Sequence, residues 1–238
     1  MKRFMFSGVM FFGVTGCATM PPDSPVGLDE NFFKNAVVIT EDIGNSVIFS
    51  TINGFQRRQG EQGTVWDDNF LRGFIDKRTG AKIFQVYNVI YYGGSGTQSG
   101  WKHFAQASYL TAEGVRRLTP TNSITEHEDC APLAVYGSCV YSEQVVFKVD
   151  EIFLKTVADS YALDSKIQWP YQLIPTNGNS YEDSMAAAEV AGLLSRMEDY
   201  QKQFSITSVG KPDNESSNII LLPEPLIVSP PATAKPPL

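Results

Sequence analysis

The chain has 238 residues and a formal net charge of −7, from 19 basic and 26 acidic residues. Nucleic acid and anionic lipid head groups attract dense positive charge, so this balance argues against both as partners. Aromatic residues make up 12% of the chain, and because they favour strands, a β-rich fold is predicted.

The N-terminal segment carries the most specific motif. Two basic residues precede an apolar run over residues 4–14, which is shorter than the about 20 residues of a membrane-spanning helix. The run ends in Val14-Thr15-Gly16-Cys17. An aliphatic residue and two small residues before a cysteine resemble the lipobox of bacterial lipoproteins. The resemblance implies cleavage before Cys17, acylation of its thiol and acylation of the new amino group, with residues 1–16 as signal peptide.

The same motif predicts where the protein works. Cleavage removes Lys2 and Arg3, two basic residues, and takes the net charge from −7 to −9. Two or more acyl chains hold a protein firmly on a bilayer. Ala18 stands where an aspartate retains lipoproteins in the inner membrane in the enterobacterial type of sorting, so the outer membrane is favoured. We therefore expect a lipid-anchored envelope protein with its domain in the periplasm, tethered by the proline-rich residues 17–29.

Residues 30–204 are predicted to form a single globular domain. Gly80 closes a turn that needs a positive φ, and Asp150 is the predicted N-cap of a short helix that ends at Asp159. Pro170 predicts that the last strand lies at a sheet edge. Apolar patterns predict antiparallel strands over 37–40, 46–52, 70–76, 82–92, 101–110, 123–129, 139–148 and 166–174, with 82–92 apolar on both faces and therefore central.

The longest helix is predicted over Ser180–Lys202, with Ser180 as N-cap and Glu182 and Asp183 in the first turn. The fold class is therefore α+β and mostly β: an antiparallel meander or sandwich with one long C-terminal helix packed on it. The proline-rich residues 205–238 are predicted to form a flexible, disordered tail. The apolar stretches of this tail, 219–222 and 226–228, either dock on the domain or bind a partner, and docking is favoured.

The three cysteines are an odd number, which fits one lipidated cysteine and one pair. Cys130 and Cys139 are predicted to form a disulfide in an oxidising compartment, worth about 3 kcal/mol. A catalytic thiol and a metal site are the alternatives, although only His127 lies nearby as a further ligand.

The chain has two histidines, and each has both a chemical and a structural interpretation. His127 and Asp129 share one face of a predicted strand, which suits a metal pair or an acid–base pair. The simpler interpretation is a solvent-facing hairpin end for His127 and a half-buried, hydrogen-bonded ring for His103. A metal site would require the strands of the two histidines to be neighbours, and neither a metal nor a cofactor is predicted.

Two further groups have both a structural and a functional interpretation. Asp67 and Asp68 follow Trp66, and Asp76 closes the next strand. For these residues, capping of loops is favoured over the paired carboxylates of a glycosidase. An aromatic sheet face around Tyr87, Tyr91, Tyr92 and Trp101 would suit a small ligand.

Three functions follow from these patterns. A non-catalytic binding or scaffolding module with an envelope protein partner ranks first. An envelope hydrolase near His103, His127 and Asp129 ranks second, and a small-ligand carrier with the aromatic face ranks third. Whether the protein is an enzyme stays open, with no catalytic residue assigned.

Overall fold

The computed structural model describes most of the domain between its two ends. Within it, the side chains of 92–95, 126–127 and 138–141 are not described, and residues 209–238 separate from the rest as a second unit. The described residues are 25, 27–41, 44–55, 68–95, 101–127, 138–161, 166–204 and 206.

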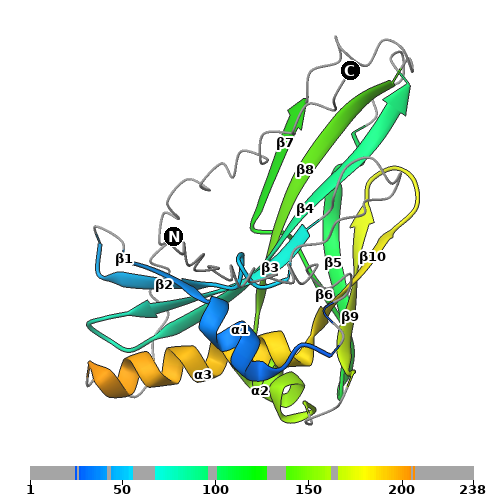
Figure 1. The fold of residues 1–238 in the computed structure, drawn as a ribbon. Coiled ribbons are helices and arrows are strands. Elements are labelled where there is room, and N and C mark those ends of the chain that lie inside the picture. The colour runs from blue at the N-terminus through cyan, green and yellow to red at the C-terminus, as the bar shows by residue number, and fades with distance from the viewer. Residues whose placement is uncertain are drawn as a thin grey trace, which may run out of the picture. The chain divides into compact units, whose positions relative to one another are not determined.

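Six antiparallel strands form the larger sheet, which we call sheet A (Figure 1). Their spatial order is β1-β2-β3-β4-β8-β7. Strand β4 lies between β3 and β8, which is the central position that the sequence predicts. The strands are β1 (Val38–Glu41), β2 (Ser46–Ser50), β3 (Asp68–Asp76), β4 (Lys82–Ser95), β7 (Asn122–His127) and β8 (Ser138–Val149).

Four antiparallel strands form sheet B, in the order β10-β9-β5-β6. The prediction of a mostly β, antiparallel fold is confirmed by these two sheets. Sheet B interrupts sheet A in the sequence, because two of its strands fall between β4 and β7. The strands are β5 (Phe104–Thr111), β6 (Gly114–Leu118), β9 (Gln168–Pro175) and β10 (Tyr181–Ala186).

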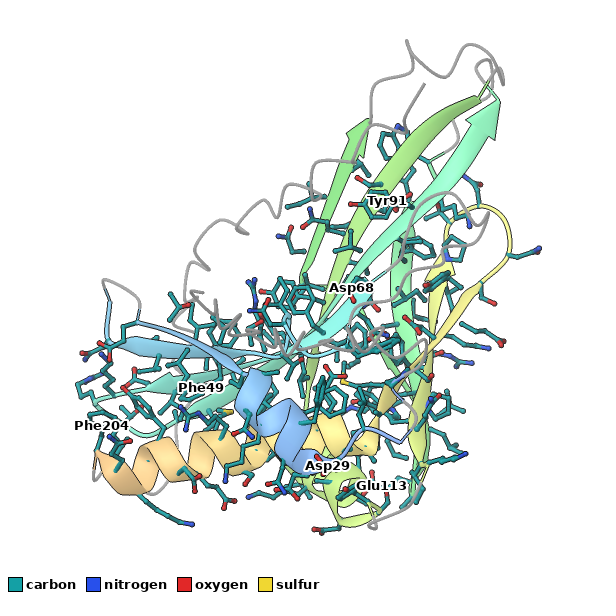
Figure 2. All side chains as sticks on the ribbon, viewed as in Figure 1. Asp29, Phe49, Asp68, Tyr91, Glu113 and Phe204 are labelled. Atoms are coloured by element: carbon teal, nitrogen blue, oxygen red, sulfur yellow. The ribbon has the colours of Figure 1, made fainter. Side chains whose placement is uncertain are left out.

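Three helices complete the domain: α1 (Glu30–Ala36), α2 (Glu151–Asp159) and α3 (Ala187–Gln203). The main core joins side chains of both sheets, α2 and α3. Tyr200 of α3 packs edge-on against Phe49 of β2 at 5.2 Å between ring centres, and Figure 2 shows Phe49 between sheet A and α3. A Cβ at Gly73 of β3 would lie 2.3 Å from the sulfur of Met197, so glycine lets α3 approach the sheet closely. Within the described residues, no helix is long and apolar enough to cross a membrane.

Local signals position several elements as predicted. Asp150 accepts hydrogen bonds from the amides of Ile152 and Phe153 and so caps α2. Gly80 has a φ of 68° in the turn between β3 and β4. Asp76 accepts hydrogen bonds from two amides of that turn, at 2.9 and 2.7 Å, which confirms the capping role of this carboxylate.

The predicted helix start at Ser180 was wrong. Residues 181–186 form strand β10, in which Asp183 and Met185 are buried and Glu182 is exposed. This alternation fits pairing with β9, and pairing with a neighbour overrides a local helix preference. The helix begins at Ala187, its N-cap Ala186 makes no side-chain cap bond, and Glu189 is the acidic residue of its first turn.

The edge position predicted for the strand with Pro170 was also wrong. β9 lies between β10 and β5, with Pro170 opposite Ser184 of β10. Pairing with β5 ends at Tyr171, so the missing amide of Pro170 falls just beyond that ladder. An interior strand therefore accommodates a proline where one of its two ladders stops.

Candidate functional site

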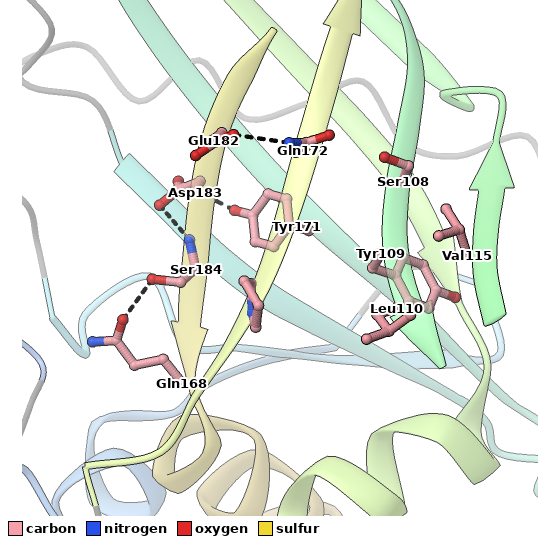
Figure 3. A pocket seen from close by; sticks show the side chains of 11 residues that line it. Ser108, Tyr109, Leu110, Val115, Gln168, Tyr171, Gln172, Glu182, Asp183 and Ser184 are labelled. Carbon is pink, nitrogen blue, oxygen red and sulfur yellow. Dashed lines mark hydrogen bonds between the residues drawn. The ribbon is translucent and has the colours of Figure 1, made fainter. Parts of the chain in front are cut away.

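An open hollow of about 680 Å³ lies on the solvent-facing side of sheet B (Figure 3). Strand alternation defines this outer face, since Tyr109 and Tyr171 point inward and are buried. Its apolar part is a cross-strand pair: Leu110 of β5 stands opposite Val115 of β6, and they are 67% and 61% exposed. Across the face the lining includes Ser108, Gln168, Pro170, Gln172, Glu182 and Ser184.

The polar side of the hollow is ordered by its own hydrogen bonds, drawn in Figure 3. The amide of Gln172 donates to the carboxylate of Glu182 at 2.8 Å, and the hydroxyl of Ser184 donates to Gln168 at 2.7 Å. These polar side chains bond one another across β9 and β10. The part of the hollow that remains available for a partner is therefore the exposed apolar pair on the β5 side.

Among the strands that the structure describes, β6 forms one edge of sheet B and pairs with β5 alone. Four of its five residues are exposed, among them Arg116 and Arg117. The backbone groups on the free side of an edge strand can bind another extended chain. The hollow and this edge adjoin at Val115, and together they form the candidate site.

A buried polar network joins the two sheets behind the hollow. The amide of Asn69 donates to the carboxylate of Asp183 at 2.6 Å and to the hydroxyl of Tyr171 at 2.9 Å. That hydroxyl donates to the side-chain oxygen of Asn88 at 2.6 Å. Asn88, Tyr171 and Asp183 are all less than 9% exposed. The network therefore fixes β9 and β10 of sheet B against β3 and β4 of sheet A.

Glu189 is a second buried carboxyl, 4% exposed in the first turn of α3. The hydroxyl of Thr51 donates to it at 2.5 Å. Burial is the main cause that raises the pKa of Glu189; the Thr51 hydrogen bond lowers it, the charges of Asp68 and Asp183 raise it, and the net result is a pKa of about 8. Strongly shifted pKa values gather at functional sites, yet this group is buried and holds α3 to Thr51, the residue that follows β2.

The structure does not bring the two histidines onto neighbouring strands. His103 precedes β5 of sheet B, is exposed and has a φ of 49°, so the predicted half-buried ring was wrong. His127 ends β7 of sheet A, where its backbone stands opposite Tyr141. The side chain of His127 and all of Asp129 lie outside the described residues. In the described part of the chain, no group of three potential ligand residues is close enough to hold a metal ion.

The other predicted site residues fall into two sets. Cys17, Cys130 and Asp67 lie outside the described residues, and Cys139 stands in β8 opposite Gly94. Lipidation and the disulfide therefore stay predictions.

The predicted aromatic face is largely occupied by packing. Tyr87 is 9% exposed and stacks on Phe70 at 5.1 Å. Trp101 is half-buried against the main core. The side chain of Tyr92 is not described, and none of the four aromatic residues lines the hollow on sheet B.

The sequence reasoning missed strand β6 and therefore the candidate site. The prediction for this region stopped at Leu110, although Glu113-Gly114 is a turn signal between two runs that suit strands. Gly114 has a φ of 118° in the structure. A search for a short hairpin at this position would have paired Leu110 with Val115.

Comparison with known proteins adds no relative: no family model, no curated protein and no solved structure matches this chain.

Proposed function

We propose that the protein is a lipid-anchored envelope module that binds a protein partner through the outer face and free edge of sheet B. The observation that carries the proposal is the exposed pair Leu110 and Val115 beside an edge strand. Covering an exposed aliphatic side chain fully is worth about 1.5–3 kcal/mol, so two adjacent ones give a small but real anchor.

The edge supplies the rest of the recognition. An extended segment of the partner adds to β6 through main-chain hydrogen bonds, while its side chains reach Leu110 and Val115. Arg116 and Arg117 follow Val115 on β6, so an acidic segment is favoured over a basic one. In the lipid-anchored form, confinement to one membrane raises the effective concentration of the module near a partner in the same envelope.

The anchor is tested at Cys17. Mass spectrometry of the protein made in its own bacterial host is expected to show a chain that begins at a diacylglyceryl-modified Cys17. The variant Cys17→Ser is expected to leave the membrane fraction, because the leader alone is too short to hold the chain. An intact leader or an unmodified thiol in the wild-type protein contradicts this part of the proposal.

The binding surface is tested by photo-crosslinking in intact cells. A photoreactive amino acid at Val115 is expected to give one discrete adduct, and Leu110→Asp in the same chain is expected to abolish it. Neither change should unfold the protein, since both side chains are mostly exposed.

Ile152 of α2 is a matched control for that experiment, because it is 77% exposed and does not line the hollow. The photoreactive group at Ile152 is expected to give no such adduct, and Ile152→Asp should leave the Val115 adduct unchanged. Equal labelling from both positions, or an adduct that survives Leu110→Asp, would remove sheet B as the partner site.

A further inference from the structure

A row of four polar side chains crosses the face of sheet A that points away from α3. Ser50, Arg72, Gln85 and Lys148 stand directly opposite one another on β2, β3, β4 and β8. Directly opposed residues share one face of a sheet, and the residues between them along the strands, such as Leu71, belong to the core on the other face. The row therefore gathers two cationic groups, one amide and one hydroxyl on a single face.

Two hydrogen-bond donors of this row are unusual because they are buried and have no acceptor among the described residues. The side-chain amide nitrogen of Gln85 has no hydrogen-bond partner although Gln85 is 0% exposed, and the Nε of Arg72 is likewise unpartnered. The guanidinium lies over the rings of Tyr87 and Phe70, at 4.3 and 5.2 Å. Within the described part of the chain, neither Arg72 nor Lys148 forms an ion pair. Buried donors are nearly always satisfied, so these point to an acceptor that binds from outside.

The row lies between two apolar rows. On one side, Phe70, Tyr87 and Val146 stand opposite one another and are at most 9% exposed. On the other side, Ile48, Phe74 and Ile83 form a half-buried row. None of the three rows contains an acidic residue. These three rows therefore place positive charge between two apolar rows, while Asp68 and Asp76 of β3 share the face but lie beyond them.

We propose that this face of sheet A binds an amphiphilic anion, a single carboxylate or phosphate group attached to an apolar chain. The stacked guanidinium of Arg72 keeps its N–H edge free for two oxygens of the head group, and the amide of Gln85 donates to one of them. Lys148 is exposed and pairing of β7 with β8 stops at Val146, so the head group enters from this end of the row. The apolar chain lies along the half-buried row of Ile48, Phe74 and Ile83.

This inference agrees with the acidic chain as a whole. A polyanion extends over a large part of the surface, so the net charge of −7 repels it. A single anionic head group contacts only Arg72 and Lys148, whose local charge is positive. The site lies on the sheet opposite to the proposed protein-binding surface and does not rest on it.

The test uses the chain from residue 17 onward, with Cys17→Ser so that no acyl chain is attached. Dodecanoate and dodecyl phosphate, below the concentrations at which they form micelles, are titrated in parallel with dodecyltrimethylammonium, acetate and inorganic phosphate. We expect saturable binding of at least one amphiphilic anion, about tenfold tighter than the cation with the same tail or the anions without one. The tighter of the two anions assigns the head group. In NMR spectra, the Gln85 side-chain amide and the Arg72 Nε–H are expected to shift.

Two variants locate the site. Lys148→Gln and Arg72→Gln are each expected to weaken binding about tenfold, and Lys202→Gln, an exposed lysine of α3, is expected to leave it unchanged. Because Arg72 packs on two rings, its variant is checked for folding by circular dichroism, and Lys148→Gln carries the test if Arg72→Gln fails to fold. The proposal is overturned if binding ignores the sign of the head group, if the tail-less anions bind as tightly, if the folded variants bind like the wild type, or if the shifts lie elsewhere.

Discussion

Replacing Glu189 by glutamine is expected to stabilise the protein at pH 8 by several kcal/mol and to remove most of the pH dependence of its stability between pH 5 and 8. In the unfolded chain this carboxyl has its ordinary pKa of 4.5, and burial raises the folded-state pKa to about 8. A raised folded-state pKa means that the folded protein binds more protons than the unfolded chain across this window. Stability is therefore fully present below pH 4.5 and is lost as the pH rises through about 8.

The measurement is the free energy of unfolding from urea titrations at pH 5, 6.5 and 8. The wild type is expected to lose roughly 1.4 kcal/mol per pH unit from this group, whereas Glu189→Gln, which can still accept the hydrogen bond from Thr51, is expected to lose little. Glu198→Gln on the exposed side of the same helix is the matched control and should follow the wild-type slope. A common slope for all three proteins would show that Glu189 is not held neutral.

Truncating Glu143 to alanine is expected to lower the free energy of unfolding by about 3 kcal/mol or more. The carboxylate is 0% exposed in β8 and accepts hydrogen bonds from three consecutive amides, those of Lys102, His103 and Phe104, at 2.8, 3.0 and 3.3 Å. Hydrogen bonds to a charged acceptor are the strong ones, and the truncation leaves all three donors without it. The truncation also removes the hydrogen bond that holds His103 at its positive φ. The backbone just before β5, and with it sheet B, is therefore expected to become more mobile.

Chemical unfolding and amide exchange over residues 102–104 measure the effect. Glu143→Gln keeps one acceptor oxygen and is expected to lose about half as much stability as Glu143→Ala. Glu113→Ala, in the exposed turn between β5 and β6, is the control and should stay within about 0.5 kcal/mol of the wild type. A Glu143→Ala protein as stable as this control would show that the three amides find other acceptors.

The parts of the fold that the sequence predicts are those set by local chemistry. Asp150 before an apolar helix, Gly80 in a tight turn and the doubly apolar strand at 82–92 each depend on a few adjacent residues, and the structure has all three. The start of α3 depends instead on a distant strand. From the sequence alone, Glu182 and Asp183 are typical of the first turn of a helix. In the structure they pair with β9, and this pairing directs the side chain of Asp183 into the core.

Neither binding surface follows from a local pattern. Arg72, Gln85 and Lys148 are far apart in the sequence, and only the register of three strands aligns them on one face. The overall acidic charge also hides this local positive row. His103 shows the converse, because an aromatic and apolar neighbourhood predicts a buried ring, while the Glu143 carboxylate holds the backbone in a conformation that leaves the ring exposed.

The interleaved strand order has a consequence for how the chain folds during its synthesis. In sheet A, β4 pairs with β8, which is made much later in the chain. In sheet B, β5 pairs with β9, and β9 pairs with β10, the last strand of the domain. Such pairings have a high contact order, which slows folding and leaves early strands unpaired for longer. A chain stalled before residue 149 therefore lacks a complete version of either sheet, and one stalled before residue 186 still lacks a complete sheet B. The two-sheet domain is complete only when its last strand, β10, has been made.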